Sequence, residues 1–148
     1  MQLAGAMQGS IYFNPLAPAD EPMNAGLKAL MQRYMSLYKS FIRPIQSECS
    51  VYHHTPVVLG LQGRGWVVNE FVSSDCSRAY AVLFRLPAAS QDCWVFKPRG
   101  LDMSRTYKIT FVEDGRSFTV DGYTLAQTGI EVCLDGPLTS QMLLFEAQ

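Results

Sequence analysis

The sequence predicts a mainly β protein: an antiparallel β-sandwich of about eight strands, Greek-key or jelly-roll in type, preceded by one strand and one long α-helix. The spacing of apolar residues changes near Pro44 from about 3.6 residues to 2, which marks a switch from helix to strands. Beyond that point, short apolar segments alternate with turns rich in Gly, Pro, Asp and Ser. Eight Phe, seven Tyr and two Trp in 148 residues supply the bulk for one core.

The N-terminal segment, Leu3 to Phe13, is small and apolar and ends in "IYF" before Asn14 and Pro15. This pattern predicts a short buried strand that enters a loop. The loop "NPLAPADEP" ends with Asp20, which suits a helix N-cap, and with Pro22, whose missing N–H costs little in a first helical turn. We therefore expect a helix to begin at Asp20.

The helix is predicted from one apolar stripe with three-and-four spacing. Its members are Leu27, Leu30, Met31, Tyr34, Leu37, Tyr38, Phe41 and Ile42. Polar residues such as Lys28, Gln32 and Ser36 occupy the other side. Pro44 is expected to end the helix, because its ring disfavours helical geometry at Arg43 and it has no N–H to donate.

Strands are predicted after the helix from the alternation of apolar and polar residues. The clearest segments are Thr106 to Phe111, Ser117 to Val120 and Ile130 to Leu134, each with one apolar face. Asp114 and Gly115 predict a hairpin turn between the first two, because Asp-Gly accepts positive φ angles. The remaining predicted strands are Val51 to Leu59, Gly65 to Val72, Ala79 to Leu86, Cys93 to Lys97 and Gln141 to Glu146.

Composition excludes several classes of function. The net charge is −1 and the basic residues form no stripe, so a nucleic-acid partner is not expected. We expect no membrane partner, because no apolar run is long enough to span a bilayer and the N-terminus lacks the pattern of a signal peptide. Nor do we expect a cofactor: "GLQGRG" lacks the Lys-Ser/Thr and the following helix of a phosphate loop.

Cysteine spacing predicts no metal site. Cys49, Cys76, Cys93 and Cys133 form no C-x-x-C pair and have no nearby His at zinc-ligand spacing. Four cysteines allow two disulfides, but a chain of this length folds without them, so two disulfides and free thiols are both open.

The polar candidates for chemistry point to structure rather than catalysis. His53 and His54 are adjacent in a strand, so their side chains face opposite sides and cannot hold one ion together; we expect surface or strand-end histidines. The acidic candidates all fall at turn positions, where they serve backbone geometry: Asp102, Glu113, Asp114, Asp121 and Asp135. We expect no catalytic pair among them.

Four aromatic residues allow either a core or a sugar-binding role. Trp66 begins an alternating strand, and strand aromatics usually fill a core. Trp94, Tyr52 and Tyr123 are the candidates for stacking on a sugar ring. If they lie exposed, the chain is a stand-alone carbohydrate-binding or protein-interaction β-sandwich module.

Several segments resemble the melibiase-type α-galactosidases, a retaining glycoside hydrolase family of the family 36 type. The junction "YKSFIRPIQS" followed by "VYHHTP" is similar to the point where the last barrel helix of that family meets its C-terminal domain. The similarity continues, in order, through "WVVNEFV", "AYAVLFR", "RGLDMSRTYKITFVEDG", "FTVDGYTLAQTGIEVCL" and "SQMLLFEA". The order and spacing of these segments carry the resemblance, since each alone is unspecific.

The resemblance implies that residues 1–46 are the last strand and helix of a (β/α)₈ barrel and residues 47–148 a C-terminal β-sandwich domain. Nothing in the chain matches the family's two catalytic carboxylates, so it implies a structural, non-catalytic region that is inactive alone. The expected partner is the parent catalytic barrel, or a second copy. Contact would be made through the helix face of Leu27, Leu30, Met31, Tyr34 and Tyr38.

Overall fold

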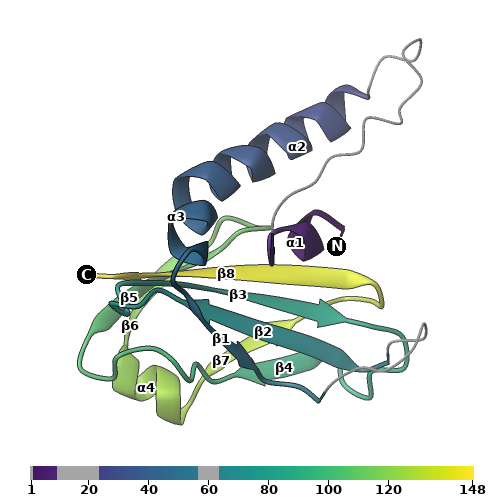
Figure 1. The fold of residues 1–148 in the computed structure, drawn as a ribbon. Coiled ribbons are helices and arrows are strands. Elements are labelled where there is room, and N and C mark those ends of the chain that lie inside the picture. The colour runs from purple at the N-terminus through teal and green to yellow at the C-terminus, as the bar shows by residue number, and fades with distance from the viewer. Residues whose placement is uncertain (1, 10–23, 57–63) are drawn as a thin grey trace.

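A computed structural model of the chain describes residues 2–9, 24–56 and 64–148. The described elements form three layers: helices on one side, a large antiparallel sheet in the middle, and a small sheet with one further helix on the other side (Figure 1). The helical layer contains α1 (Gln2–Ala6), α2 (Ala25–Leu37), a π-helical turn η1 (Tyr38–Ile42) and α3 (Arg43–Gln46).

Six strands form the large sheet, in the order β1-β2-β3-β8-β5-β6, and every neighbouring pair is antiparallel. Their bounds are β1 Ser50–His53, β2 Trp66–Val72, β3 Arg78–Arg85, β8 Thr139–Ala147, β5 Thr106–Phe111 and β6 Ser117–Asp121. The small sheet pairs β4 (Cys93–Phe96) with β7 (Ile130–Cys133). The predicted mainly β, antiparallel, eight-stranded architecture with one long helix is confirmed.

The central strands β3 and β8 are buried on both faces. In β3, Ala81 and Leu83 face a core shared with the small sheet, whereas Tyr80 and Val82 face a second core under the helices. All four side chains are fully buried. Strands buried on both sides read as continuous apolar runs rather than alternating ones, as in the "AYAVLF" of β3.

The lower part of the helical layer covers the second core. Phe41, Ile42 and Ile45 are buried against the sheet together with Tyr34 of α2 and Met7, which follows α1. The helix therefore forms part of this domain's own core along its C-terminal half. Because a fully buried large apolar side chain is worth about 1.5–3 kcal/mol, this contact is a substantial share of the stability.

The N-terminal strand predicted over Leu3 to Phe13 is wrong where the structure describes it, because residues 2–6 form helix α1. The sequence "QLAGA" is rich in helix formers and has no period of two, and helix propensity prevails. The "IYF" part of that prediction lies outside the described residues.

Helix α2 begins at Ala25 rather than at Asp20, which lies outside the described residues. Asn24 is the N-cap: its side-chain Oδ1 accepts hydrogen bonds from the N–H of Gly26 at 2.8 Å and of Leu27 at 3.4 Å.

Pro44 does not end the helix, contrary to the prediction. The α-helical hydrogen-bond pattern gives way first to η1, in which the N–H of Arg43 bonds to the carbonyl of Tyr38. Pro44 then falls in the first turn of α3, where a missing N–H costs little. A π-helical turn has no clear sequence signal, and for this reason the continuation past Pro44 was not predicted.

Helix α4 (Gly122–Gln127) is an element that the strand pattern did not predict. Asp121, expected at a turn, is its N-cap and accepts a hydrogen bond from the N–H of Thr124 at 2.8 Å. Gly122 is required there, since a Cβ atom would lie 2.3 Å from the carbonyl oxygen of Asp102.

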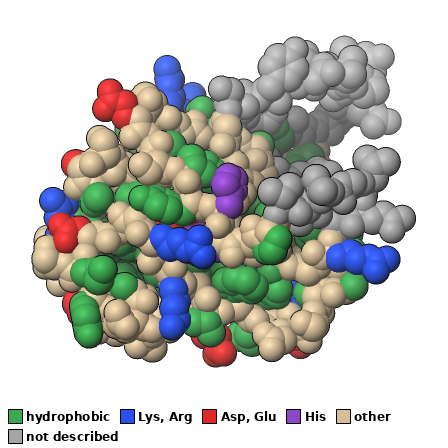
Figure 2. Space-filling view, turned by 60° about the horizontal axis from the view of Figure 1, so that its bottom comes forward, with side chains coloured by type: hydrophobic (Ala, Val, Ile, Leu, Met, Phe, Trp, Pro, Cys, Tyr) green, Lys and Arg blue, Asp and Glu red, His purple; other side chains and the backbone are tan. Residues whose placement is uncertain are grey.

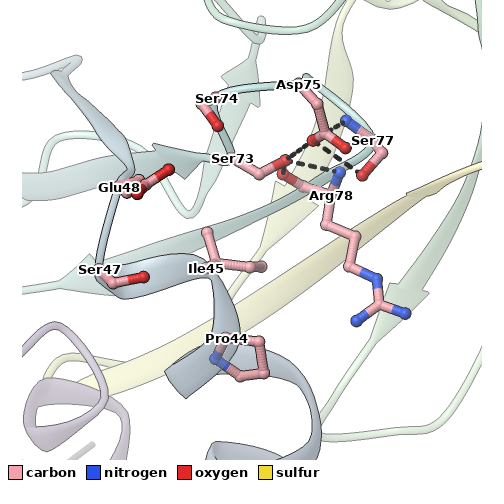
Figure 3. Close-up of a pocket in the computed structure, with 9 residues that line it drawn as sticks. All are labelled: Pro44, Ile45, Ser47, Glu48, Ser73, Ser74, Asp75, Ser77 and Arg78. Atoms are coloured by element: carbon pink, nitrogen blue, oxygen red, sulfur yellow. Dashed lines mark hydrogen bonds between the residues drawn. The ribbon is translucent and has the colours of Figure 1, made fainter.

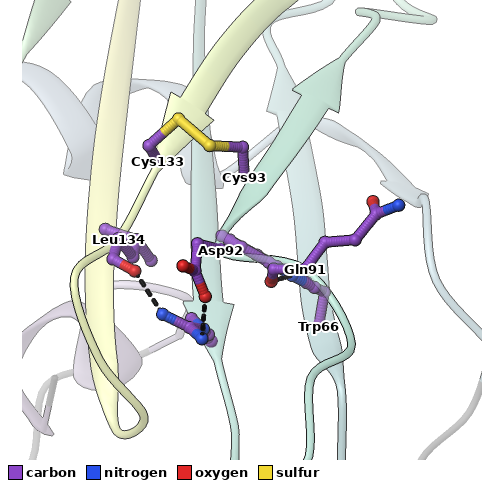
Figure 4. Close-up of a disulfide and its surroundings, with 7 residues drawn as sticks. Trp66, Gln91, Asp92, Cys93, Cys133 and Leu134 are labelled. Carbon is purple, nitrogen blue, oxygen red and sulfur yellow. Dashed lines mark hydrogen bonds and ion pairs between the residues drawn. A yellow bond between two sulfur atoms is a disulfide. The ribbon is translucent and has the colours of Figure 1, made fainter.

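The small sheet is closed by one disulfide. Cys93 and Cys133 are opposite each other in β4 and β7 and are joined (Figure 4). Cys49 and Cys76 are free. The guanidinium of Arg85 donates to the carbonyl of Leu134 and pairs with Asp92. Arg85 thereby links the large sheet to the small one.

We predict that the double substitution Cys93→Ser/Cys133→Ser lowers the free energy of unfolding by up to about 4 kcal/mol, because the bond closes a segment of 40 residues. Urea unfolding monitored by Trp fluorescence measures the loss. The matched control is Cys49→Ser/Cys76→Ser, which removes two thiols without opening a bond. Equal midpoints for the two double variants would contradict the prediction.

Candidate functional site

Glu70 is the most deeply buried carboxylate among the described residues, with 1% of its surface exposed. It lies in β2, and its two oxygens accept three hydrogen bonds: from Nε2 of His54 at 2.7 Å, from the N–H of Arg99 at 2.9 Å and from the N–H of Gly100 at 3.0 Å. Through these bonds Glu70 joins β2 to the end of β1 and to the segment before β5.

His54 directly follows the end of β1, which agrees with the strand-end alternative of the prediction, but it does not lie at the surface. Its side chain is 6% exposed and lies beside Phe96, with ring centroids 4.9 Å apart. His53 does lie at the surface, and its Nδ1 is 2.8 Å from Oδ1 of Asn69. The two histidines bond to different partners, as expected for adjacent residues of a strand.

The surroundings of Glu70 are packed rather than open. A Cβ atom on Gly100 would lie 2.5 Å from Cε2 of Tyr52, so only glycine lets this segment approach β1 so closely. Arg99 also donates from its guanidinium to the carbonyl of His53 at 3.1 Å. Because its oxygens accept hydrogen bonds from two backbone N–H groups and one imidazole, Glu70 has a structural role that holds these segments together.

The aromatic candidates are distributed over three elements: Tyr52 in β1, Trp94 in β4 and Tyr123 in α4. Tyr52 and Trp94 are half-buried and pack against the core, and Trp94 lies beside Trp66, with ring centroids 6.0 Å apart. Tyr123 is 62% exposed. Sugar stacking by Trp94, Tyr52 and Tyr123 stays a prediction, and of the three only Tyr123 presents most of its ring to solvent.

Trp66 has the core role that strand aromatics usually have. It is 8% exposed, and its indole N–H donates to the carbonyl of Gln91 at 3.2 Å. On the face that carries the small sheet, hydrophobic side chains are interspersed with charged and polar ones rather than gathered into one platform (Figure 2).

An open pocket of ≈390 Å³ lies between the end of α3 and the turn from β2 to β3 (Figure 3). It is lined by Pro44, Ile45, Ser47, Glu48, Ser73, Ser74, Asp75, Ser77 and Arg78. The carboxylate of Asp75 accepts from the hydroxyl of Ser73 at 2.6 Å and from the N–H and hydroxyl of Ser77 at 2.9 Å. These hydrogen bonds hold the pKa of Asp75 well below its ordinary value, and they fix the turn.

Three of the predicted turn carboxylates do serve local backbone geometry. Asp102 accepts from the N–H and hydroxyl of Ser104, Asp114 accepts from the N–H of Arg116, and Asp121 caps α4. Hydrogen bonding to the anion lowers the pKa of both Asp102 and Asp121.

Glu113 differs from these carboxylates, contrary to the turn role that was expected. Its side chain turns inward, where it accepts from the hydroxyl of Tyr34 at 3.1 Å and from the N–H of Met142 at 2.9 Å, and it is also bonded by the amide of Gln141. It therefore links the β5–β6 turn to helix α2 and to β8. Sequence spacing gave no signal for these contacts, which join residues 79 and 29 positions apart.

One group of possible metal ligands occurs in the described part of the chain: Cys93, Glu131 and Cys133. The two sulfur atoms are bonded to each other, so they are not available as thiolate ligands.

Among the described residues, no helix is both long enough and apolar enough to cross a membrane.

The N-terminal half of helix α2 carries exposed apolar side chains. Leu27 is 49% exposed and Leu30 42% exposed, although both continue the stripe whose lower member, Tyr34, is buried. The N-terminal end of α2 projects away from the sheet (Figure 1). The predicted packing of the helix on the sandwich thus holds for its C-terminal half, from Tyr34 onward.

We predict that Glu70→Ala lowers the free energy of unfolding by about 3 kcal/mol or more, because three buried donors lose their acceptor. The control Glu131→Ala, at an exposed position of β7, should change it by no more than about 0.5 kcal/mol. Urea titration of both variants decides the matter. Losses of the same size would mean that the Glu70 hydrogen bonds contribute nothing measurable.

The chain was compared with known proteins and structures. No curated protein matches it significantly. Among solved structures, it is similar to the GH36 alpha-galactosidase AgaB from Geobacillus stearothermophilus, with 23% identity and a TM-score of 0.66, covering 85% of this chain and 16% of that one. It is also similar to the alpha-galactosidase from Lactobacillus brevis, with 20% identity, a TM-score of 0.66, and 85% and 17% coverage.

A third similar structure is the galactosidase domain of the alpha-galactosidase-sucrose kinase AgaSK, with 18% identity, a TM-score of 0.66, and 85% and 17% coverage. At these identities the structures show a shared fold, and the chain spans about a sixth of their length. The family model described as the glycosyl hydrolase family 36 C-terminal domain matches residues 66–145, more than half of the chain. The chain therefore belongs to glycosyl hydrolase family 36, of which it carries the C-terminal domain.

Proposed function

We propose that this chain is the non-catalytic C-terminal region of a larger α-galactosidase-like glycoside hydrolase, in which it packs beside the catalytic barrel and stabilises it. The observation that carries this proposal is that only part of the apolar stripe of helix α2 is covered. The sheet buries the stripe from Tyr34 onward and leaves it exposed at Leu27 and Leu30.

The exposed part of the stripe fits a protein partner. Leu27 and Leu30 lie three positions apart, on the side of the helix that also carries Met31 and Tyr34. Covering two half-exposed leucines contributes on the order of 1 kcal/mol each. An apolar row flanked by polar residues is the pattern of a helix that packs against another structural layer.

The sizes of the similar structures support a partner within a larger protein. This chain corresponds to 16–17% of the galactosidases of like fold, so a protein of that kind has most of its mass elsewhere. We assign the cover of Leu27 and Leu30 to the catalytic barrel in that remaining part. From the resemblance to the barrel family we propose that the division between barrel-derived and sandwich residues falls after residue 46.

The carboxylates support a non-catalytic role. Retaining glycosidases use two carboxylates about 5–5.5 Å apart that face the substrate. Here Glu70 and Glu113 bond to backbone N–H groups inside the fold, and Asp75, Asp102 and Asp121 hold turns or a helix cap. We expect the purified chain to show no hydrolysis of an aryl α-galactoside.

An immunoblot of the source cells, with antibody raised against this chain, tests the proposal. The expected band is several times heavier than the 16.5 kDa of the chain. A band at 16.5 kDa, or hydrolysis of an aryl α-galactoside by the purified chain, would overturn the proposal.

We predict that the isolated chain associates through the exposed helix face and that Leu27→Glu/Leu30→Glu abolishes this association. Sedimentation velocity over a concentration series measures it. The control, Gln32→Glu/Ser36→Glu, adds the same charge on the opposite, exposed side of α2 and should leave association unchanged. A wild-type chain that stays monomeric throughout the series, or equal behaviour of the two variants, would show that the face is not adhesive.

A further inference from the structure

The outer face of the small sheet carries three side chains that can ligate a metal ion. Cys93 of β4 and Cys133 of β7 are directly opposite each other and are joined by the disulfide (Figure 4). Glu131 precedes Cys133 by two positions and therefore lies on the same face of β7. The two sulfur atoms and a carboxylate oxygen of Glu131 all lie within 4.8 Å of one another.

We propose that the disulfide masks a zinc site, which opens when a dithiol reductant cleaves the bond between Cys93 and Cys133. The reductant transfers two electrons and two protons to the two sulfur atoms, and its own two thiols become a disulfide. Zn²⁺ then displaces the two thiol protons and binds two thiolates and the carboxylate of Glu131, with water as the fourth ligand. This inference does not depend on the proposed function.

The pairing of β4 with β7 has support besides the disulfide. On the inner face of the small sheet, Phe96, Ile130 and Val132 are buried in the core shared with the large sheet. The ladder also continues past the cysteines, since the N–H of Leu134 donates to the carbonyl of Asp92 at 2.9 Å. We therefore expect the two strands to keep their register after reduction, which leaves the two thiols opposite each other.

The two cysteine positions have a separation that suits zinc. With Zn–S distances of about 2.3 Å, two sulfur ligands of a tetrahedral site lie about 3.8 Å apart. The Cα atoms of Cys93 and Cys133 are 4.0 Å apart, and rotation of the free side chains about χ1 covers this spacing. Binding thus needs side-chain rotation without a change in strand register.

The three ligand residues are accessible from solvent. Cys133 and Glu131 are exposed and Cys93 is half-buried, so a small reductant and a metal ion both reach them. Over residues 2–9, 24–56 and 64–148, no Lys, Arg or His forms an ion pair with Glu131, so its carboxylate is free to ligate. Opposite Glu131 lies Val95, which has no ligand atom and leaves the fourth position to water.

The donor set favours zinc over hard cations. Two thiolates are soft ligands and suit Zn²⁺, whereas Ca²⁺ and Mg²⁺ prefer a larger set of oxygen ligands. Cys93 and Cys133 are 40 positions apart, so the local spacing of the cysteines gave no zinc signal in the sequence.

Cobalt(II) is the probe for the test, because it occupies tetrahedral zinc sites and its thiolate complexes show charge-transfer absorption that zinc lacks. The Cys49→Ser/Cys76→Ser variant is used, since Cys93 and Cys133 are then its only cysteines. It is reduced with dithiothreitol, freed of the reductant under argon and titrated with cobalt. We expect one equivalent of cobalt to bind with thiolate absorption and zinc to displace it. The same variant in its oxidised form should show no such absorption.

Two further measurements separate this site from adventitious binding to thiols. Cys93→Ser/Cys133→Ser retains Cys49 and Cys76 and, treated in the same way, should give no thiolate absorption. Urea above the unfolding midpoint should abolish the absorption of the reduced Cys49→Ser/Cys76→Ser chain, because the ligands are held by paired strands. Absent absorption in that chain without urea, persistence in urea, or equal absorption from the two double variants would overturn the inference.

Glu131→Gln, made in the Cys49→Ser/Cys76→Ser background, tests the carboxylate ligand. Loss of even an outer-shell partner weakens metal affinity by about 10–100-fold, so loss of a direct ligand should weaken cobalt binding by at least about tenfold. Asp135→Asn is the matched control, since it neutralises an exposed carboxylate outside the ligand group and should leave the affinity unchanged. Equal cobalt affinities for these two variants would overturn the assignment of Glu131 as a ligand.

Discussion

The structure depends on one constraint: the central strands of the large sheet are apolar on both faces. Leu143 and Phe145 of β8 face the small sheet, and Met142 and Leu144 face the helices. A sheet of this kind is stable only when both faces are covered, because each uncovered face exposes a row of large apolar side chains. The small disulfide-bonded sheet with α4 supplies one cover, and the lower half of the long helix supplies the other.

Each cover is fastened by polar contacts placed at its margin. Arg85 connects the large sheet to the small one through Leu134 and Asp92, and Glu70 gathers the end of β1 and the segment at Gly100. Glu113 does the same for the helix. Burying a carboxylate costs free energy unless its oxygens accept hydrogen bonds. In both glutamates these hydrogen bonds offset that cost, and they also hold together segments that are distant in sequence.

Most of the strands could be predicted from the sequence because their patterns are local. The alternation in Tyr107 to Phe111 and the Asp-Gly turn at Gly115 depend on neighbours within a few residues, and both were correct. The features that escaped depend on distant or weak signals. The pairing of His54 with Glu70 spans 16 positions and buries the side chain of a histidine that was expected at the surface or at a strand end. Helix α4 and the π-helical turn are too short for periodicity to mark.

The same reasoning applies to the helix, whose pattern was predicted correctly but whose partner could not be. An apolar stripe on a helix indicates that another structural element covers it, but it does not identify that element. Here the sheet covers the stripe from Tyr34 onward. By our proposal, a barrel outside this chain covers Leu27 and Leu30. A division of the chain after residue 46 follows the resemblance to the barrel family, but the packing crosses it, since Phe41 and Ile42 lie in the same core as Tyr80. The C-terminal half of the helix is therefore part of the core of the sandwich, on whichever side of residue 46 the barrel-derived segment ends.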